Sequence, residues 1–136
     1  MSASWALQQA IYATLVSSDG IKEVLGDPPR VFDAPPRDAD FPYCVIGDDQ
    51  ASDWSTATEA GSEHIVPVRV WSRANGHREA KSIAGAVQDA LDGAELAVAG
   101  RALIDLRWLD TNAVRDSDGE TMRAVLRFRA VMEPQS

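Results

Sequence analysis

The sequence has 136 residues, of which 45% are hydrophobic and 25% charged; this fits one soluble globular domain with an ordinary core and excludes wholesale disorder. Its 21 acidic and 13 basic side chains give a net charge of −8, which argues against a protein that grips nucleic acid through the phosphates. The surplus lies entirely in residues 1–63, with 11 acidic and 3 basic side chains, and two interpretations are open: two surfaces of unlike charge, or acid-rich loops that are simply solvated.

The chain opens with a predicted amphipathic helix over residues 4–17, because apolar residues recur at helical spacing. Ser2 or Ser4 is expected to cap its start. A short helical turn over residues 21–25 follows. Residues 26–42 hold five of the seven prolines, which predicts an extended connector.

Two strands are predicted next, separated by a loop. The apolar run 43–47 predicts a central strand covered on both faces, and residues 48–61 predict a polar loop. Residues 63–72 alternate in polarity, which is typical of a strand. Pro67 lies within this run and cannot donate a ladder hydrogen bond, so we expect this strand at an edge or bulged.

The second half predicts one more helix and a β-hairpin. Asn75 is expected to cap a helix that ends at Gly93. Its apolar stripe comprises Ala80, Ile83, Ala84, Val87 and Leu91. Two alternating strands then surround a turn at residues 116–119. Their predicted core-facing residues are Ala102, Ile104, Leu106 and Trp108 in the first strand, and Met122, Ala124, Leu126, Phe128 and Ala130 in the second.

This order of elements predicts an α+β fold in a single domain, residues 1–136. We expect two helices packed on one face of a largely antiparallel four-stranded sheet, with a C-terminal β-hairpin.

His64 is the strongest candidate for catalysis, since Asp48 or Asp49 is expected nearby across the sheet. A base beside a carboxylate is a possible catalytic pair, but a nucleophile with a defined position is missing. We therefore predict no enzyme, no catalytic residue and no cofactor.

Metal and redox chemistry have weak signals. Asp116, Asp118 and Glu120 resemble part of a calcium loop but lack the remaining ligands, so a solvated turn and no metal site are expected. Cys44, the only cysteine, is expected to be a small buried hydrophobe. With no secretory signal and no apolar stretch of membrane-spanning length, the sequence predicts a protein made and kept in a reducing cytoplasm until it joins a larger assembly.

Arginines and aromatics suggest contact surfaces. The last strand presents Arg123, Arg127 and Arg129 on its outward face, opposite candidate partners such as Asp105 and Asp110. An ion-paired sheet face or a subunit interface fits this row better than phosphate binding. Trp54, Trp71 and Tyr43 are the kind of residue that anchors protein interfaces. Alternatively, the loop around Trp54 folds back and plugs the domain's own core.

Short motifs spread along most of the chain resemble the siphophage tail terminator, or tail-completion, family, and the version found in gene transfer agents. They are Leu7-x-x-Ala10-x-Tyr12-x-x-Leu15, Val24-Leu25-Gly26, Phe41-Pro42-Tyr43, Asp53-Trp54-Ser55, His64, Val70-Trp71-Ser72, Gly76, Glu79-Ala80, Leu91-Asp92-Gly93 and Val125-Leu126-Arg127-Phe128-Arg129.

The resemblance implies a structural protein of the tail or neck of a phage-like particle. It implies a homohexameric ring that caps the head-proximal end of the tail tube, contacts the tube protein and a head-side connector or stopper protein, and lets DNA pass without specific binding. It implies no membrane contact. A cyclic ring needs unlike patches that meet between neighbours. The interface candidates are Asp53, Trp54, Trp71, Arg123, Arg127 and Arg129, and the candidates for an acidic lumen that repels DNA are Asp48, Asp49 and Glu59.

Two alternatives stay open. One is a small hydrolase or acid–base enzyme that uses His64. The other is a head-completion or head–tail stopper protein of the same neck region, which shares small size and ring symmetry.

Overall fold

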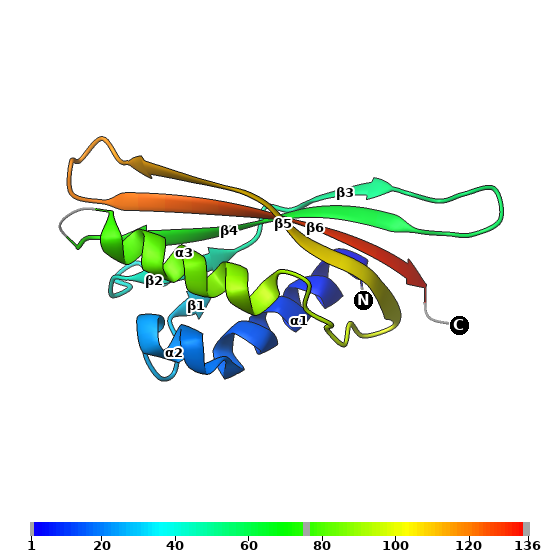
Figure 1. The fold of residues 1–136 in the computed structure, drawn as a ribbon, viewed down its shortest axis with the longest axis horizontal. Helices are drawn as coiled ribbons and strands as arrows, with labels where there is room; N and C mark the ends of the chain where they lie inside the picture. Colours follow the sequence, from blue (N-terminus) through cyan, green and yellow to red (C-terminus); the bar gives the residue numbers. More distant parts are fainter. Residues whose placement is uncertain (1, 75–76, 135–136) are drawn as a thin grey trace.

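A computed structural model describes residues 2–74 and 77–134 and places three helices on one face of a twisted sheet (Figure 1). The helices are α1 (Ala3–Ser17), α2 (Asp19–Leu25) and α3 (Arg78–Leu91). The strands are β1 (Val31–Phe32), β2 (Tyr43–Ile46), β3 (Gln50–Asp53), β4 (Ser62–Ser72), β5 (Arg101–Arg115) and β6 (Met122–Pro134). The strand order is β1-β2-β4-β6-β5, with β3 paired beside the first part of β4; β1 and β2 are parallel and the other pairs antiparallel.

The α+β class and the C-terminal hairpin are confirmed, but the predicted count of two helices and four strands is wrong. The third helix is α2, expected only as a short turn. Strand β1 is two residues long and lies inside the proline-rich connector, where the Cys44 N–H donates to the Arg30 carbonyl at 2.9 Å. Strand β3 lies inside the predicted polar loop and is exposed along its whole length, so it carries no alternation that a sequence could reveal.

The prediction that β4 lies at an edge or is bulged is also wrong, because β4 lies between β6 on one side and β2 and β3 on the other, and its register with β6 is unbroken from Ser62 to Ser72. Pro67 is tolerated because it lies opposite the point where β2 gives way to β3. There the Gly47 N–H donates to the Pro67 carbonyl at 3.2 Å, and Gly47 and Asp48 turn the chain at φ 145° and 57°. The ladder is interrupted at this point, so the missing N–H of Pro67 leaves no strand partner without a hydrogen bond.

The core fills the space between the sheet and the helices. The predicted α3 stripe and the predicted inward face of β6 are both buried there, as is Cys44, whose thiol pKa is raised by burial to about 12. Strand β2 is covered on one face only: Cys44 and Ile46 are buried, whereas Tyr43 and Val45 are half-buried on the other face, so the expected cover on both faces is wrong. The sheet therefore has a helix-covered face and an open face.

Strand β5 departs from the predicted alternation. Its pairing with β6 shifts register between Leu103 and Asp105 and again between Trp108 and Asp110. These bulges leave Ile104 and Leu109 without partners in the ladder and 55% and 41% exposed, although alternation had placed Ile104 in the core.

The predicted cap of α3, Asn75, lies outside the described residues. Within the described ranges, no helix has both the length and the apolar character needed to cross a bilayer.

Candidate functional site

The β3–β4 hairpin projects beyond the helices at one end of the sheet (Figure 1). Its connection is closed by the Trp54 N–H, which donates to the Gly61 carbonyl at 3.0 Å. The Asp53 carboxylate accepts from the Ser55 hydroxyl at 2.7 Å and from the Ser55 N–H at 3.3 Å, so it helps to order the turn. Glu59 is exposed in the same connection.

Trp54 remains on the surface of this hairpin. Its side chain is 49% exposed, and the Arg129 guanidinium lies 5.7 Å from its ring centroid. The alternative in which Trp54 plugs the domain's own core is therefore wrong. An exposed tryptophan with a cation on its ring is available for contact with another protein.

Two lumen candidates lie where β2 passes into β3. The Asp48 side chain is 88% exposed and contacts Arg69 at 3.4 Å. Asp49 lies 3.9 Å from Nδ1 of His64, as the sequence predicted for one of these two carboxylates. Part of the acidic charge in this region is thus already matched within the subunit.

His64 is buried, at 1% exposure, in a small polar cluster. Its Nε2 lies 2.9 Å from the Ser62 hydroxyl and its Nδ1 lies 3.3 Å from the Ser4 hydroxyl. Burial lowers the pKa of the imidazole, and the nearby Asp49 carboxylate opposes this effect. The contacts resemble a serine–histidine–carboxylate arrangement, but the imidazole is enclosed and each of its ring nitrogens already lies beside a hydroxyl of the subunit. The cluster satisfies the polar atoms of a buried side chain and joins α1 to β4.

The arginine row of β6 lies on the open face and is largely paired, as predicted. The Arg127 Nε donates to Asp110 at 2.9 Å, and a second guanidinium N–H bonds the other carboxylate oxygen. Hydrogen bonding from Arg127 lowers the pKa of Asp110, and the same hydrogen bond raises the pKa of Arg127. Arg129 Nε donates to Glu63 at 2.7 Å. Among the described residues, the buried Nε of Arg123 has no hydrogen-bond partner.

Aromatic side chains gather at the other end of the open face, as the sequence predicted for two of them. Tyr43 and Trp71 are directly opposite each other on β2 and β4, and their rings stack with centroids 5.5 Å apart at 20°. Phe41 packs on Tyr43 at 5.0 Å, and the Arg73 guanidinium lies 4.3 Å from the Phe41 ring. The cluster gives this part of the open face an apolar surface.

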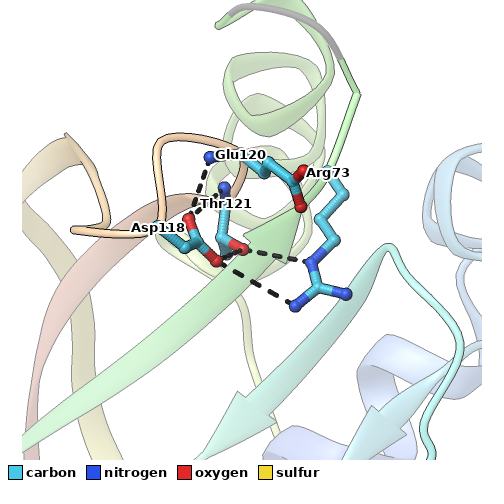
Figure 2. Close-up of polar contacts among 4 residues, drawn as sticks. All are labelled: Arg73, Asp118, Glu120 and Thr121. Atoms are coloured by element: carbon cyan, nitrogen blue, oxygen red, sulfur yellow. Dashed lines mark hydrogen bonds and ion pairs between the residues drawn. The ribbon is translucent and has the colours of Figure 1, made fainter.

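Arg73 also ties the end of β4 to the β5–β6 turn (Figure 2). Its Nε donates to the Thr121 hydroxyl at 3.1 Å, and a terminal nitrogen lies 4.0 Å from Asp118. Asp118 accepts from the N–H groups of Glu120 and Thr121, both at 2.9 Å, and from the Thr121 hydroxyl at 2.7 Å. These bonds lower the pKa of Asp118 to about 2, the Thr121 N–H having the largest effect.

The expected solvated turn at residues 116–119 is confirmed, since Asp118 uses its oxygens to order the turn backbone. In the described part of the chain, no three histidine, cysteine, aspartate or glutamate side chains cluster as a metal site requires.

Four exposed hydrophobic side chains were missed by the sequence reasoning. Trp5 and Tyr12 are each 45% exposed on α1, while Ile104 and Leu109 are exposed on β5. The first pair had a usable signal, because residues seven apart share one side of a helix. The second pair had none, because their exposure results from bulges that appear only when β5 pairs with β6.

Comparisons with known proteins cover almost the whole chain. Residues 9–133 match the family described as tail completion protein gp17. The tail completion protein gp17 of Bacillus phage SPP1 is 28% identical over 127 residues, which span 93% of this chain and 92% of that protein. A chain of the solved virion of a native gene transfer agent particle superposes with a TM-score of 0.90 at 34% identity, covering 97% of this chain and 98% of that chain. The chain therefore belongs to the tail completion protein gp17 family, whose members are structural proteins of the virion tail.

Proposed function

We propose that the protein forms a hexameric ring that caps the head-proximal end of the tail tube, ends tube polymerisation and joins the tail to the head connector, with DNA passing through the ring. The observation that carries this proposal is the near-complete match to a chain of an assembled gene transfer agent virion, with a TM-score of 0.90. A likeness that covers both chains almost entirely supports the same place in a particle. Its partners are then copies of itself, the tube protein and a head-side protein, and the subunit is made in the cytoplasm of the producing cell.

The acidic β2–β3 junction and hairpin are proposed to rim the opening of the ring, through Asp48, Asp49 and Glu59. Exposed carboxylates repel phosphates, and weak binding lets a duplex slide through a conduit. The exposure of Asp48 and Glu59 supports this placement, whereas Asp49 faces His64. A ring structure with all three of these side chains and Asp53 on the outer wall would rule it out.

The hairpin and the open sheet face are proposed as contact surfaces with other subunits or tail proteins. The residues are Asp53, Trp54, Trp71, Arg123, Arg127 and Arg129. The exposure of Trp54 and the unpartnered Nε of Arg123 support this role, whereas Arg127 and Arg129 already have carboxylate partners within the subunit.

Electron microscopy of particles made without this gene tests the proposed function. Overlong tails detached from heads are expected if the protein terminates the tube. Normal-length tails beside filled heads would favour the second candidate, a head-completion or head–tail stopper protein. A small hydrolase is tested separately: full particle activity of a His64→Ala variant that folds would dismiss it.

A further inference from the structure

One row of side chains crosses the open face of the sheet at the end that the β5–β6 turn closes (Figure 1). In the register of the strands, Trp71 on β4 lies between Tyr43 on β2 and Arg123 on β6. Val114 on β5 lies on the other side of Arg123. All four side chains are partly exposed, and the rings of Tyr43 and Trp71 stack on each other. The row therefore places one cation between an aromatic pair and an aliphatic side chain.

Arg123 differs from the other two arginines of β6, because it has no carboxylate beside it. Arg127 donates to Asp110 through Nε and a terminal nitrogen, and Arg129 donates to Glu63 through Nε. Among the described residues, the buried Nε of Arg123 has no hydrogen-bond partner, and no carboxylate lies within ion-pair distance of its guanidinium. Withdrawing a cation from water costs free energy unless an anion compensates it. Arg123 thus presents on the open face a charge that the subunit itself does not neutralise.

The surroundings of Arg123 favour a carboxylate over a phosphate as its anion. Arginine binds both groups through paired N–H donors. Tryptophan, tyrosine and arginine side chains together are typical of the centre of protein–protein interfaces, where apolar neighbours exclude water from a charged contact. The net charge of −8 opposes close approach of a nucleic acid backbone. The anion that fits this row is therefore an aspartate or glutamate side chain.

The placement of the row favours a different protein over a second copy of this chain. Asp48, Glu63 and Asp110 each contact an arginine of their own subunit. Glu59 lies on the projecting hairpin, at the opposite end of the sheet from the row (Figure 1). Copies in the proposed ring lie side by side, whereas the two unlike ends of each subunit are expected to face other proteins.

Resting on the place in the particle proposed above, we infer that Arg123 binds an aspartate or glutamate side chain of a different particle protein. The carboxylate accepts hydrogen bonds from the terminal nitrogens of Arg123. Apolar side chains beside it on the partner pack on the stacked rings of Tyr43 and Trp71.

Carbodiimide cross-linking in assembled particles tests this contact, because the reagent joins an amine directly to a carboxylate that lies against it. Arg123→Lys keeps the cation and supplies the amine, and the chain has only two native lysines, Lys22 and Lys81. Arg78→Lys is the matched control, since Arg78 is exposed on the helical side. Mass spectrometry of the linked peptides identifies both ends of each cross-link.

The Arg123→Lys chain is expected to form an amide between position 123 and an aspartate or glutamate of a different particle protein, whereas the control forms none at position 78. A link from position 123 to a second copy, or to a carboxylate of its own chain, would overturn the inference. Complete particles that give no link would overturn it as well but would leave the proposed function standing. Particles with no ring of this protein at the tail end would instead overturn the proposed function.

A second measurement separates this contact from a structural role of Arg123. Arg123→Leu removes a charge that the subunit does not neutralise, so the melting temperature of the free subunit is expected to stay the same or rise. Completed particles are expected to fall about tenfold or more, because the partner's carboxylate is left unpaired, while Arg78→Leu leaves the yield unchanged. A lower melting temperature together with a lower yield would contradict the inference. A normal yield of particles that release DNA abnormally would indicate a phosphate as the anion and would also overturn it.

Discussion

At the scale of single residues, Asp118 shows how one carboxylate orders a whole connection. It binds two backbone N–H groups and the Thr121 hydroxyl, and Arg73 reaches it from the end of β4 (Figure 2). The carboxylate is stabilised in its charged form by these bonds, so its pKa in the folded chain is about 2. The unfolded chain binds the same proton near pH 3.9.

Asp118→Asn is therefore expected to lower stability at neutral pH, and the difference from the native chain should disappear as the pH falls. The contribution of Asp118 is fully present above about pH 4 and is lost as the pH falls through the folded pKa of about 2. Urea midpoints between pH 7 and pH 2 measure it. Asp116→Asn is the control, since Asp116 closes the turn through its backbone groups. A difference for Asp118→Asn that stays constant down to pH 2 would contradict this explanation.

His64 predicts a loss of stability in a higher pH range than Asp118 does. Because burial lowers its pKa, the unfolded chain takes up a proton near pH 6.5 that the folded chain accepts only at lower pH. The stability that His64 contributes is fully present above about pH 6.5 and is lost as the pH falls from there through the lowered pKa of the folded imidazole. His64→Gln, which keeps hydrogen-bonding groups without this titration, is expected to show a shallower loss in thermal melts between pH 7.5 and 5. Equal slopes for the two proteins would show that His64 is not the group responsible.

At the scale of elements, Ser18 joins two helices. It is the C-cap of α1, where its N–H donates to the Leu15 carbonyl, and the N-cap of α2, where its hydroxyl accepts from the Ile21 N–H at 3.4 Å. An N-cap hydroxyl satisfies an N–H that has no partner within the helix. Ser18 thus serves the end of α1 with its backbone N–H and the start of α2 with its hydroxyl.

Ser18→Ala is expected to destabilise the protein by about 1 kcal/mol, the usual effect of removing an N-cap. The neighbouring Ser17→Ala is the matched control: its hydroxyl donates to the Ala13 carbonyl within α1, and alanine is the better helix former, so a change within about 0.5 kcal/mol is expected. Denaturant unfolding of the two variants measures the contrast. Equal effects would mean that α2 does not need the cap.

Elements buried on one face could be predicted from the sequence, and elements that depend on neighbours could not. The stripe of α3 and the inward face of β6 follow helical and strand periodicity and are buried as predicted. The alternation of β5 failed because two bulges shift its register against β6. Pro67 suggested an edge strand because the sequence does not show that β2 ends opposite it.

In the candidate site, too, some contacts could be predicted from the sequence and others could not. His64 was expected beside Asp48 or Asp49, and the structure places Asp49 there. The arginine row was expected beside carboxylates such as Asp105 and Asp110; Asp110 does bind Arg127, whereas Asp105 binds Arg107 on its own strand. The contact of Arg73 with Asp118 was not foreseen, since it joins residues far apart in the chain through a turn whose geometry the sequence leaves open.

At the scale of the whole molecule, only some of the surplus carboxylates in the first half of the chain are exposed. Asp48 and Glu59 are exposed at the β2–β3 junction and on the projecting hairpin, whereas Glu63 is bound to Arg129 and Asp49 lies beside His64. The exposed carboxylates of this region are the ones that the proposed conduit would use.

The double variant Asp48→Lys and Glu59→Lys is expected to leave the number of completed tails unchanged and to slow DNA release several-fold at low salt, because lysines hold phosphates and the attraction weakens as salt rises. Particle counts by electron microscopy and the rate of DNA release measure the two effects. The control, Asp89→Lys with Glu95→Lys, makes the same change in charge at exposed positions on the helical side. Equal slowing by both variants would contradict a lumenal position for Asp48 and Glu59.

The two ends of the sheet are closed by different hairpins, so the subunit has two unlike ends. The β3–β4 hairpin extends at one end with Trp54 and Glu59, and the short β5–β6 turn, fastened by Arg73, closes the other (Figure 1). Any closed ring of such subunits has a front and a back that differ in shape and charge. In the ring that we propose, one side is expected to contact the tube protein and the other side the head-side protein. The orientation of such a ring would then follow from the asymmetry of one 136-residue subunit.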